Sequence, residues 1–201
     1  MSKTTDPGLE LAEGAIALDA EGRPVVVRGG RLQRLLSFDE ALLVSVQRFR
    51  NPWRTAIART LTALGDGKSW TVLGLACLAT FTPRGVHVGL RIGAGATLAT
   101  VFSQTLKRSL TRARPDSAIG GFEALAENPD QFSFPSGHTS AAFGVAVALA
   151  GEPHGVGPAA LLLAVGIGLS RVYLGAHYPL DVGAGALLGV FAGLAARLLV
   201  A

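Results

Sequence analysis

Five apolar segments fill most of the chain after residue 66 and constrain its fold more than any other feature. A helix needs about 20 apolar residues to cross the hydrocarbon core of a bilayer. The second, fourth and fifth segments are long enough, and the two shorter ones gain length from flanking polar turns. The segments cover residues 69–82, 86–106, 137–151, 158–175 and 179–200. They predict an all-α, polytopic transmembrane helical bundle with five spanning helices, or six if residues 38–65 also cross.

The composition agrees with a membrane protein. Hydrophobic residues make up 49% of the 201 residues and charged residues only 16%, against about 25% charged in a typical soluble protein. The 26 glycines indicate closely packed helices. The formal charge is +4, but aromatic residues do not alternate with the basic ones, which excludes a nucleic-acid-binding face. Cys77, the single cysteine, can form neither an internal disulfide nor a cysteine metal site.

The part before the apolar segments is more polar and divides into two regions. Residues 1–36 form a polar segment in which residues 15–28 fit a small hairpin. Residues 37–66 fit amphipathic or interfacial helices, the first capped by Ser37 with Glu40 three residues later. The remaining residues, 67–201, form the predicted transmembrane core.

Two short patterns have ordinary explanations. The stretch GDGKS at residues 65–69 looks like the end of a phosphate-binding P-loop, but Thr62 stands where that motif needs its first glycine, and no strand precedes it. Gly185, Gly189 and Gly193 are spaced by four in the last apolar segment. Such a stripe lets helices approach closely, more often within one bundle than in a dimer.

The polar residues that matter most lie at the ends of the apolar segments. If successive segments alternate in direction, these ends meet at one face of the membrane. Charged residues at a membrane boundary are costly unless they are paired or used, so one functional site is predicted there. Its candidate residues are Lys107 and Arg114 after the second segment, Ser136, Gly137 and His138 at the start of the third, Arg171 near the end of the fourth, His177 in the next turn, and Asp181 at the start of the fifth.

Three of these residues are cations, which suit a phosphate group. Arginine matches phosphate oxygens with two parallel hydrogen bonds, and lysine adds a point charge. The start of the third segment adds free backbone N–H groups and the positive end of a helix dipole. There Ser136 can donate a further hydrogen bond, and Gly137 lets the backbone approach the anion closely.

The two histidines fit phosphoryl transfer through a phosphohistidine. His177 and Asp181 are four residues apart, so the carboxylate can fix the tautomer of His177 and leave the other ring nitrogen free as a nucleophile. His138 opens a different helix and can protonate the leaving oxygen. This chemistry requires no metal and no other cofactor, because the three cations stabilise the developing charge.

The same residues resemble the signature of the type 2 phosphatidic acid phosphatase family, which is related to the vanadium haloperoxidases. The family pattern is Lys, six residues, Arg-Pro; then Pro-Ser-Gly-His; then Ser-Arg, five residues, His, three residues, Asp. Here the three parts lie at residues 107–115, 135–138 and 170–181. The resemblance implies a helical-bundle lipid phosphatase in which His177 is the nucleophile, Asp181 orients it and His138 is the acid. It also implies that the phosphate is held by Lys107, Arg114, Ser136, Gly137 and Arg171.

The leading functional prediction is an integral membrane phosphatase for a lipid phosphate or diphosphate, such as phosphatidic acid, phosphatidylglycerol phosphate or undecaprenyl diphosphate. Lipid-to-lipid phosphotransfer uses the same site, and only product analysis separates it from hydrolysis. The apolar helices disfavour a haloperoxidase. A non-catalytic lipid transporter or scaffold is the alternative from another class, and it predicts unchanged phosphate release when His177 is replaced by Ala.

The basic residues at the other ends of the helices bear on the orientation. Arg84, Arg91 and Arg197 favour that side as cytoplasmic. The chain is therefore expected in a bacterial inner membrane with its active site on the periplasmic face. Its expected partners are the bilayer and a lipid phosphate, and the oligomeric state stays open.

Overall fold

The computed structural model describes residues 16–18, 24–26, 31–126 and 130–201, and the chain divides into two compact units, Met1–Leu42 and Leu43–Ala201. In the first unit, strands β1 (Ile16–Leu18) and β2 (Pro24–Val26) pair antiparallel. Helix α1 (Arg31–Gln47) also begins there. The Ser37 hydroxyl donates to the Gln33 carbonyl one turn earlier, so Ser37 lies inside α1 instead of capping it, and the helix begins six residues sooner than expected.

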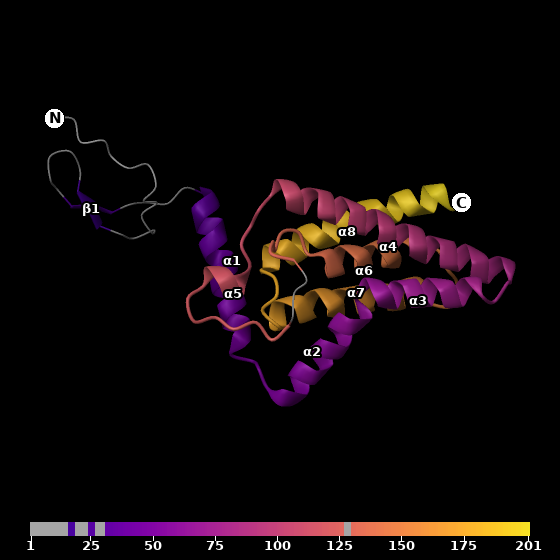
Figure 1. Ribbon diagram of the computed structural model, residues 1–201, viewed down its shortest axis with the longest axis horizontal. Coiled ribbons are helices and arrows are strands. Elements are labelled where there is room, and N and C mark those ends of the chain that lie inside the picture. The colour runs from indigo at the N-terminus through magenta and orange to yellow at the C-terminus, as the bar shows by residue number, and fades with distance from the viewer. Residues whose placement is uncertain (1–15, 19–23, 27–30, 127–129) are drawn as a thin grey trace. The chain divides into compact units, whose positions relative to one another are not determined.

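The second unit is a bundle of helices, so the predicted all-helical fold is confirmed. Figure 1 shows α3, α4, α6, α7 and α8 running lengthwise beside one another, while α2 departs from that direction at its junction with α3. The bounds are α2 Pro52–Leu64, α3 Gly67–Leu78, α4 Pro83–Ser109, α5 Pro115–Ala118, α6 Gly137–Ala148, α7 Val156–Tyr173 and α8 Pro179–Leu199. The starts of α3, α6 and α8 and the ends of α4 and α7 lie at the same end of the bundle (Figure 1).

Helix α6 lies at the centre of the bundle and packs against α4, α7 and α8. Glycines make its closest contacts possible. A Cβ atom on Gly189 or Gly193 of α8 would overlap the carbonyl oxygen of Ser140 or Gly144 of α6. The glycine stripe of α8 is therefore used inside the bundle, where close backbone approach replaces the packing of large side chains.

The outward faces of the long helices are apolar. Leu162 of α7 is 75% exposed, and Phe191 and Leu198 of α8 are 67% and 84% exposed. Exposure of this kind is unfavourable in water but matches the interior of a bilayer. In the part of the chain that the structure describes, three helices are long and apolar enough to cross a membrane: Pro83–Ser109, Val156–Tyr173 and Pro179–Leu199. Crossing by the shorter α3 and α6, and hence a total of five or six spans, stays a prediction.

Candidate active site

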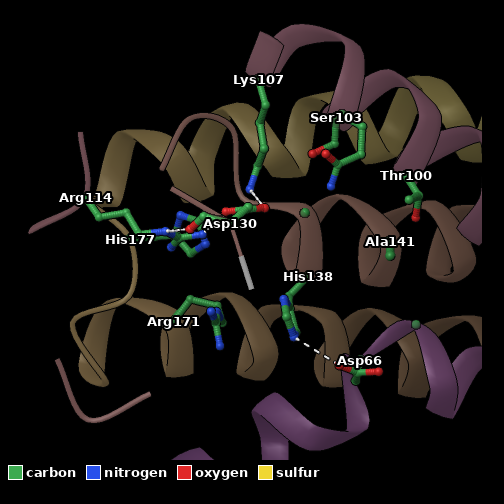
Figure 2. A pocket seen from close by; sticks show the side chains of 14 residues that line it. Asp66, Thr100, Ser103, Lys107, Arg114, Asp130, His138, Ala141, Arg171 and His177 are labelled. Carbon is green, nitrogen blue, oxygen red and sulfur yellow. Dashed lines mark hydrogen bonds and ion pairs between the residues drawn. The ribbon is translucent and has the colours of Figure 1, made fainter. Parts of the chain in front are cut away.

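The predicted site residues meet at the end of the bundle where α6 and α8 begin. They surround a cavity of about 200 Å³, seen in Figure 2. Ser136 and Asp181 are fully buried behind its lining. The other six reach its wall: Lys107, Arg114, Gly137, His138, Arg171 and His177. Alternation of helix direction, on which the prediction of a single site depended, therefore brings the three motifs together.

Lys107 and Arg114 share one carboxylate partner inside the cavity. The Lys107 Nζ atom donates a 2.6 Å hydrogen bond to Asp130 Oδ2, and the Arg114 guanidinium donates to Asp130 Oδ1. Both cations are nearly inaccessible to solvent. Burial opposes ionisation of Asp130, but these hydrogen bonds outweigh it and hold the pKa of Asp130 below its ordinary value. One carboxylate therefore pairs with both cations and offsets one of their two positive charges.

Arg171 approaches the cavity from the end of α7. It is 1% exposed, and its Nη1 atom donates a 3.0 Å hydrogen bond to the Thr62 hydroxyl of α2. Thr62, the residue that breaks the P-loop pattern, therefore holds one of the cations in place. Arginine so placed presents further N–H groups to the cavity in a fixed fork.

The start of α6 supplies backbone donors. The first N–H groups of a helix lack partners within that helix and suit an anion. A Cβ atom on Gly137 would meet only the Ser103 hydroxyl, at 3.6 Å, so a larger side chain there would extend into the cavity. The Ser136 N–H donates to the Asp181 carbonyl at 3.0 Å, and the Ser136 hydroxyl accepts from Thr139 at 2.9 Å. Ser136 thus fixes the start of α6 against α8 instead of facing the cavity.

His177 and Asp181 form a buried pair between α7 and α8. The His177 Nδ1 atom faces Asp181 Oδ2 at 3.7 Å, an ion-pair distance rather than a hydrogen bond; catalytic pairs are often this long before substrate binds. The same Oδ2 atom accepts the Tyr178 N–H at 3.0 Å, and Oδ1 accepts Arg112 Nη1 at 2.7 Å. The carboxylate is thereby held from two sides.

The protonation state of His177 follows from its surroundings. Burial lowers the pKa of His177 to about 4, a shift that Asp181 opposes and the positive charges of Arg171 and Arg114 reinforce. The imidazole is therefore neutral near pH 7. With Nδ1 directed at Asp181, the Nε2 atom retains its lone pair.

His138 stands across the cavity from this pair and has a second carboxylate neighbour. Its Nε2 atom lies 3.9 Å from Asp66 Oδ2 in the turn between α2 and α3 (Figure 2). Asp66 belongs to the GDGKS stretch. Within the described residues, no group of three or more His, Cys, Asp or Glu side chains is arranged to hold a metal ion. The cavity thus combines buried cations, backbone donors, a neutral histidine and a second histidine.

Residues 88–201, more than half of the chain, match the family model of the PAP2 superfamily. The chain belongs to the PAP2 superfamily. The match contains all eight predicted site residues, and the resemblance inferred from the three motifs is confirmed.

Individual PAP2 proteins extend the likeness beyond the motifs. The decaprenylphosphoryl-5-phosphoribose phosphatase of Mycobacterium tuberculosis is 35% identical over 156 residues, or 76% of this chain and 85% of that protein. The crystal structure of Aquifex aeolicus LpxE aligns with a TM-score of 0.64 at 32% identity, covering 78% of this chain and 92% of that one. The transmembrane PAP2 type phosphatidylglycerolphosphate phosphatase from Bacillus subtilis aligns with a TM-score of 0.68 at 27% identity, covering 83% and 86%. The prediction of a phosphatase is confirmed.

Four residues of the site were missed by sequence reasoning: Thr62, Asp66, Arg112 and Asp130. Arg112 lies inside the basic cluster between Lys107 and Arg114, so the density of charge there was a usable signal. Asp66 had a signal in the glycines on either side of it, which mark a break between helices. Thr62 and Asp130 had none, because a single polar residue in a helix or loop carries no pattern.

Proposed function

We propose that this PAP2 protein is an integral membrane phosphatase that removes phosphate from a lipid phosphate or diphosphate through a phosphohistidine, without a metal ion. One observation carries the proposal. A neutral, fully buried His177, backed by Asp181, shares a 200 Å³ cavity with Lys107, Arg114 and Arg171. A nucleophile that lies so near a set of cations is suited to attack a phosphate ester.

In the first step, His177 Nε2 attacks phosphorus and forms a P–N bond while the P–O bond to the lipid breaks. The leaving oxygen takes a proton from protonated His138, so the lipid departs as an alcohol, or as a monophosphate if the substrate is a diphosphate. Asp181 stabilises the positive charge that develops on His177 and keeps Nδ1 protonated. His138 is left neutral.

In the second step, a water molecule attacks phosphorus from the side that the lipid has vacated. Neutral His138 accepts a proton from this water. The electron pair of the P–N bond returns to Nε2 of His177, and inorganic phosphate is released. Both histidines are then in their starting protonation states, so the cycle closes.

The cations stabilise charge on the phosphoryl oxygens during both steps. The substrate phosphate takes the position of the Asp130 carboxylate on Lys107 and Arg114, while Arg171 and the first N–H groups of α6 bind the remaining oxygens. Donors already held in place need no reorganisation as charge develops, which makes them effective in a site closed to water. Thr62 and Ser136 contribute indirectly, by fixing Arg171 and the start of α6.

The size of the cavity supports a lipid substrate whose tail stays outside. At about 200 Å³, it is smaller than the roughly 300–1,000 Å³ of pockets that enclose whole drug-sized ligands. A phosphate group and the adjoining ester oxygen suit that space. The lipid tail then stays in the bilayer, whose interior also covers the exposed apolar faces of α7 and α8. Phosphatidic acid, phosphatidylglycerol phosphate and undecaprenyl diphosphate all meet this description.

Charge at the other end of the bundle supports the proposed orientation. Glu152, in the turn between α6 and α7, accepts Arg91 Nη1 at 3.2 Å and lies 3.9 Å from Arg84. Arg197 lies against Gly151 in the same turn. Two arginines thus lie at one carboxylate and a third lies beside the same turn, and such an excess is typical of the cytoplasmic side. The active site then faces the periplasm of a bacterial inner membrane.

The direct test is phosphate release by the purified protein from a panel of lipid phosphates and diphosphates in detergent micelles. A donor labelled in its phosphate should leave an acid-labile, base-stable label on the wild-type protein after rapid quenching. The His177→Ala variant should release no phosphate and carry no label. Release of phosphate by this variant at the wild-type rate would exclude the phosphohistidine mechanism.

A further inference from the structure

The break between α2 and α3 is built into the wall of the catalytic cavity. Helix α2 ends at Leu64 and α3 begins at Gly67. The residues between them, Gly65 and Asp66, line the cavity. The break has a fixed geometry, because Trp70 Nε1 donates to the Gly65 carbonyl at 3.2 Å and the Ser69 hydroxyl donates to the Ala63 carbonyl at 2.7 Å.

The two carboxylate oxygens of Asp66 have different neighbours. Oδ1 accepts the Lys68 N–H at 2.8 Å and so caps the start of α3. Oδ2 lies 3.9 Å from His138 Nε2, and a dashed line joins the two residues in Figure 2. Capping needs an oxygen but no charge, since asparagine and serine cap as well as aspartate does. The negative charge on the side facing His138 therefore requires a separate explanation.

The charges around His138 supply that explanation. Burial disfavours a positive imidazolium most, and Arg171 of α7, His177 of the α7–α8 turn and Lys107 of α4 add to that effect, so the pKa of His138 lies well below its ordinary value before substrate binds. Asp66 is the negative group whose charge favours that imidazolium. Asp130, the other carboxylate of the cavity, is engaged by Lys107 and Arg114. A general acid must carry its proton before the reaction begins. A bound phosphate anion offsets the cations of the cavity, and Asp66 then adds a second negative charge on the opposite side of His138.

We propose that Asp66 is a positioning residue that favours the protonated form of His138 once the substrate phosphate is bound, with Nε2–H toward its own carboxylate and Nδ1–H toward the leaving oxygen of the substrate. This inference rests on the proposed function, in which His138 is the acid. As the P–O bond breaks, the Nδ1 proton passes to the leaving oxygen, and the Nε2 proton stays on His138 facing Asp66. Asp66 keeps its negative charge throughout and exchanges no proton.

The Asp66→Asn variant separates the charge from the cap, because asparagine retains the oxygen that accepts the Lys68 N–H. It should be assayed on two substrates in detergent micelles. Dioleoyl phosphatidic acid has an alkoxide leaving group that needs a proton, whereas p-nitrophenyl phosphate releases a phenolate that does not. We expect kcat/KM for phosphatidic acid to fall about tenfold. This loss is smaller than the usual contribution of general acid catalysis, because the Asp66 side chain is 48% exposed and its charge is partly screened by solvent. For p-nitrophenyl phosphate, kcat/KM should change less than about twofold.

The pH profile and two further variants complete the test. In Asp66→Asn, the alkaline limb of kcat for phosphatidic acid, which reports the enzyme–substrate complex, should move to lower pH, because His138 loses its proton more readily. Asp66→Glu retains the charge and should recover most of the activity on phosphatidic acid. Ser69→Ala disturbs the same helix break without removing a charge, and it should leave the ratio of the two substrates' kcat/KM values at the wild-type value.

The outcomes are distinguishable. Asp66→Asn could lower kcat/KM equally for both substrates, or leave the hydrolysis of phosphatidic acid and the alkaline limb of its pH profile unchanged. Either result means that Asp66 is only a helix cap, so the inference is wrong while the proposed function stands. If the wild-type protein hydrolyses no lipid phosphate at all, the proposed function fails and the inference fails with it.

Discussion

The Nζ atom of Lys107 and the Oδ2 atom of Asp130 lie 2.6 Å apart at the centre of the cavity that PAP2 motifs surround. Arg114 binds the other oxygen of the same carboxylate. Two cations that the sequence suggests for phosphate are thus paired with one carboxylate of the chain itself. An incoming phosphate has to compete with that carboxylate, which leads to the first prediction.

Replacing Asp130 by Asn should strengthen the binding of phosphate-like anions. The amide keeps the shape of the side chain but removes the charge that competes for Lys107 and Arg114. We expect the inhibition constant of vanadate to fall about fivefold to tenfold, as measured by phosphate release from phosphatidic acid. Asp116→Asn, on the exposed surface of α5, is the matched control and should leave the constant unchanged. Weaker inhibition of Asp130→Asn by vanadate would contradict the competition.

Removing the charge of Asp181 should slow the chemical step more than it weakens substrate binding. Asp181→Asn retains an oxygen for the Tyr178 N–H but loses the charge that, in the proposed mechanism, stabilises the positive His177 intermediate. We expect kcat to fall about 10²- to 10⁴-fold with a much smaller change in KM. Steady-state kinetics on phosphatidic acid measure both. A rise in KM with kcat intact would instead place Asp181 in substrate binding.

Folding stability should decrease in acid because of His177. Its pKa in the folded protein is about 4, below the ordinary 6.5. The unfolded chain takes up the proton as the pH falls through 6.5, whereas the folded protein resists it until about 4. Stability is therefore complete above pH 6.5 and is lost progressively between 6.5 and 4. Thermal unfolding in detergent at pH 7.5 and pH 5 should show a smaller acid-induced drop for His177→Gln than for the wild type. Equal drops would assign the acid sensitivity to other groups.

Metal chelation should leave phosphate release intact, and vanadate should block it. In the proposed mechanism the charge that a metal would supply comes from Lys107, Arg114 and Arg171. Vanadate resembles phosphate and occupies the same position. Assays with excess EDTA, and with vanadate added to the untreated protein, measure the two effects. Activity that depends strictly on added Mg²⁺ would overturn the metal-free mechanism.

Adding a methyl group at the contact between α6 and α8 should destabilise the bundle. A Cβ atom at position 189 would overlap the Ser140 carbonyl oxygen, whereas a Cβ atom at Gly183 of the same helix would meet nothing within 4 Å. We expect Gly189→Ala to lower the free energy of unfolding by about 1–3 kcal/mol. Gly183→Ala should be neutral or stabilising by up to about 1 kcal/mol, because alanine favours helix. Unfolding of both variants in detergent gives the comparison.

Most of the helical architecture could be predicted from the apolar segments, because each contains one helix of the bundle. The grouping of Lys107, His138 and His177 at one end also followed from alternating helix direction alone. The boundary at Ser37 was wrong, because local cap chemistry favoured a start there while the chain continues the helix back to Arg31. A residue with cap preference can bond within a helix instead, and sequence does not decide between the two.

The partners of the predicted residues were out of reach of sequence reasoning. Asp130 meets Lys107 only because the connection between α4 and α6 folds back over the cavity, and such a path leaves no periodic trace in the sequence. Asp66 is far from His138 along the chain and reaches it only through the packing of α2 and α3 on their neighbours. The motif residues could be predicted because their types and spacings carry the chemistry, whereas their partners are chosen by the tertiary fold.

The hydrogen bond from the Ser136 N–H to the Asp181 carbonyl joins the start of α6, the proposed anion-binding turn, to the first turn of α8, which carries the proposed partner of His177. Gly185 packs directly against the Ser136 carbonyl within this seam. A substitution several turns away along α6 or α8 can therefore tilt both halves of the site at once. For the redesign of substrate preference, the α6–α8 seam is therefore best left unchanged.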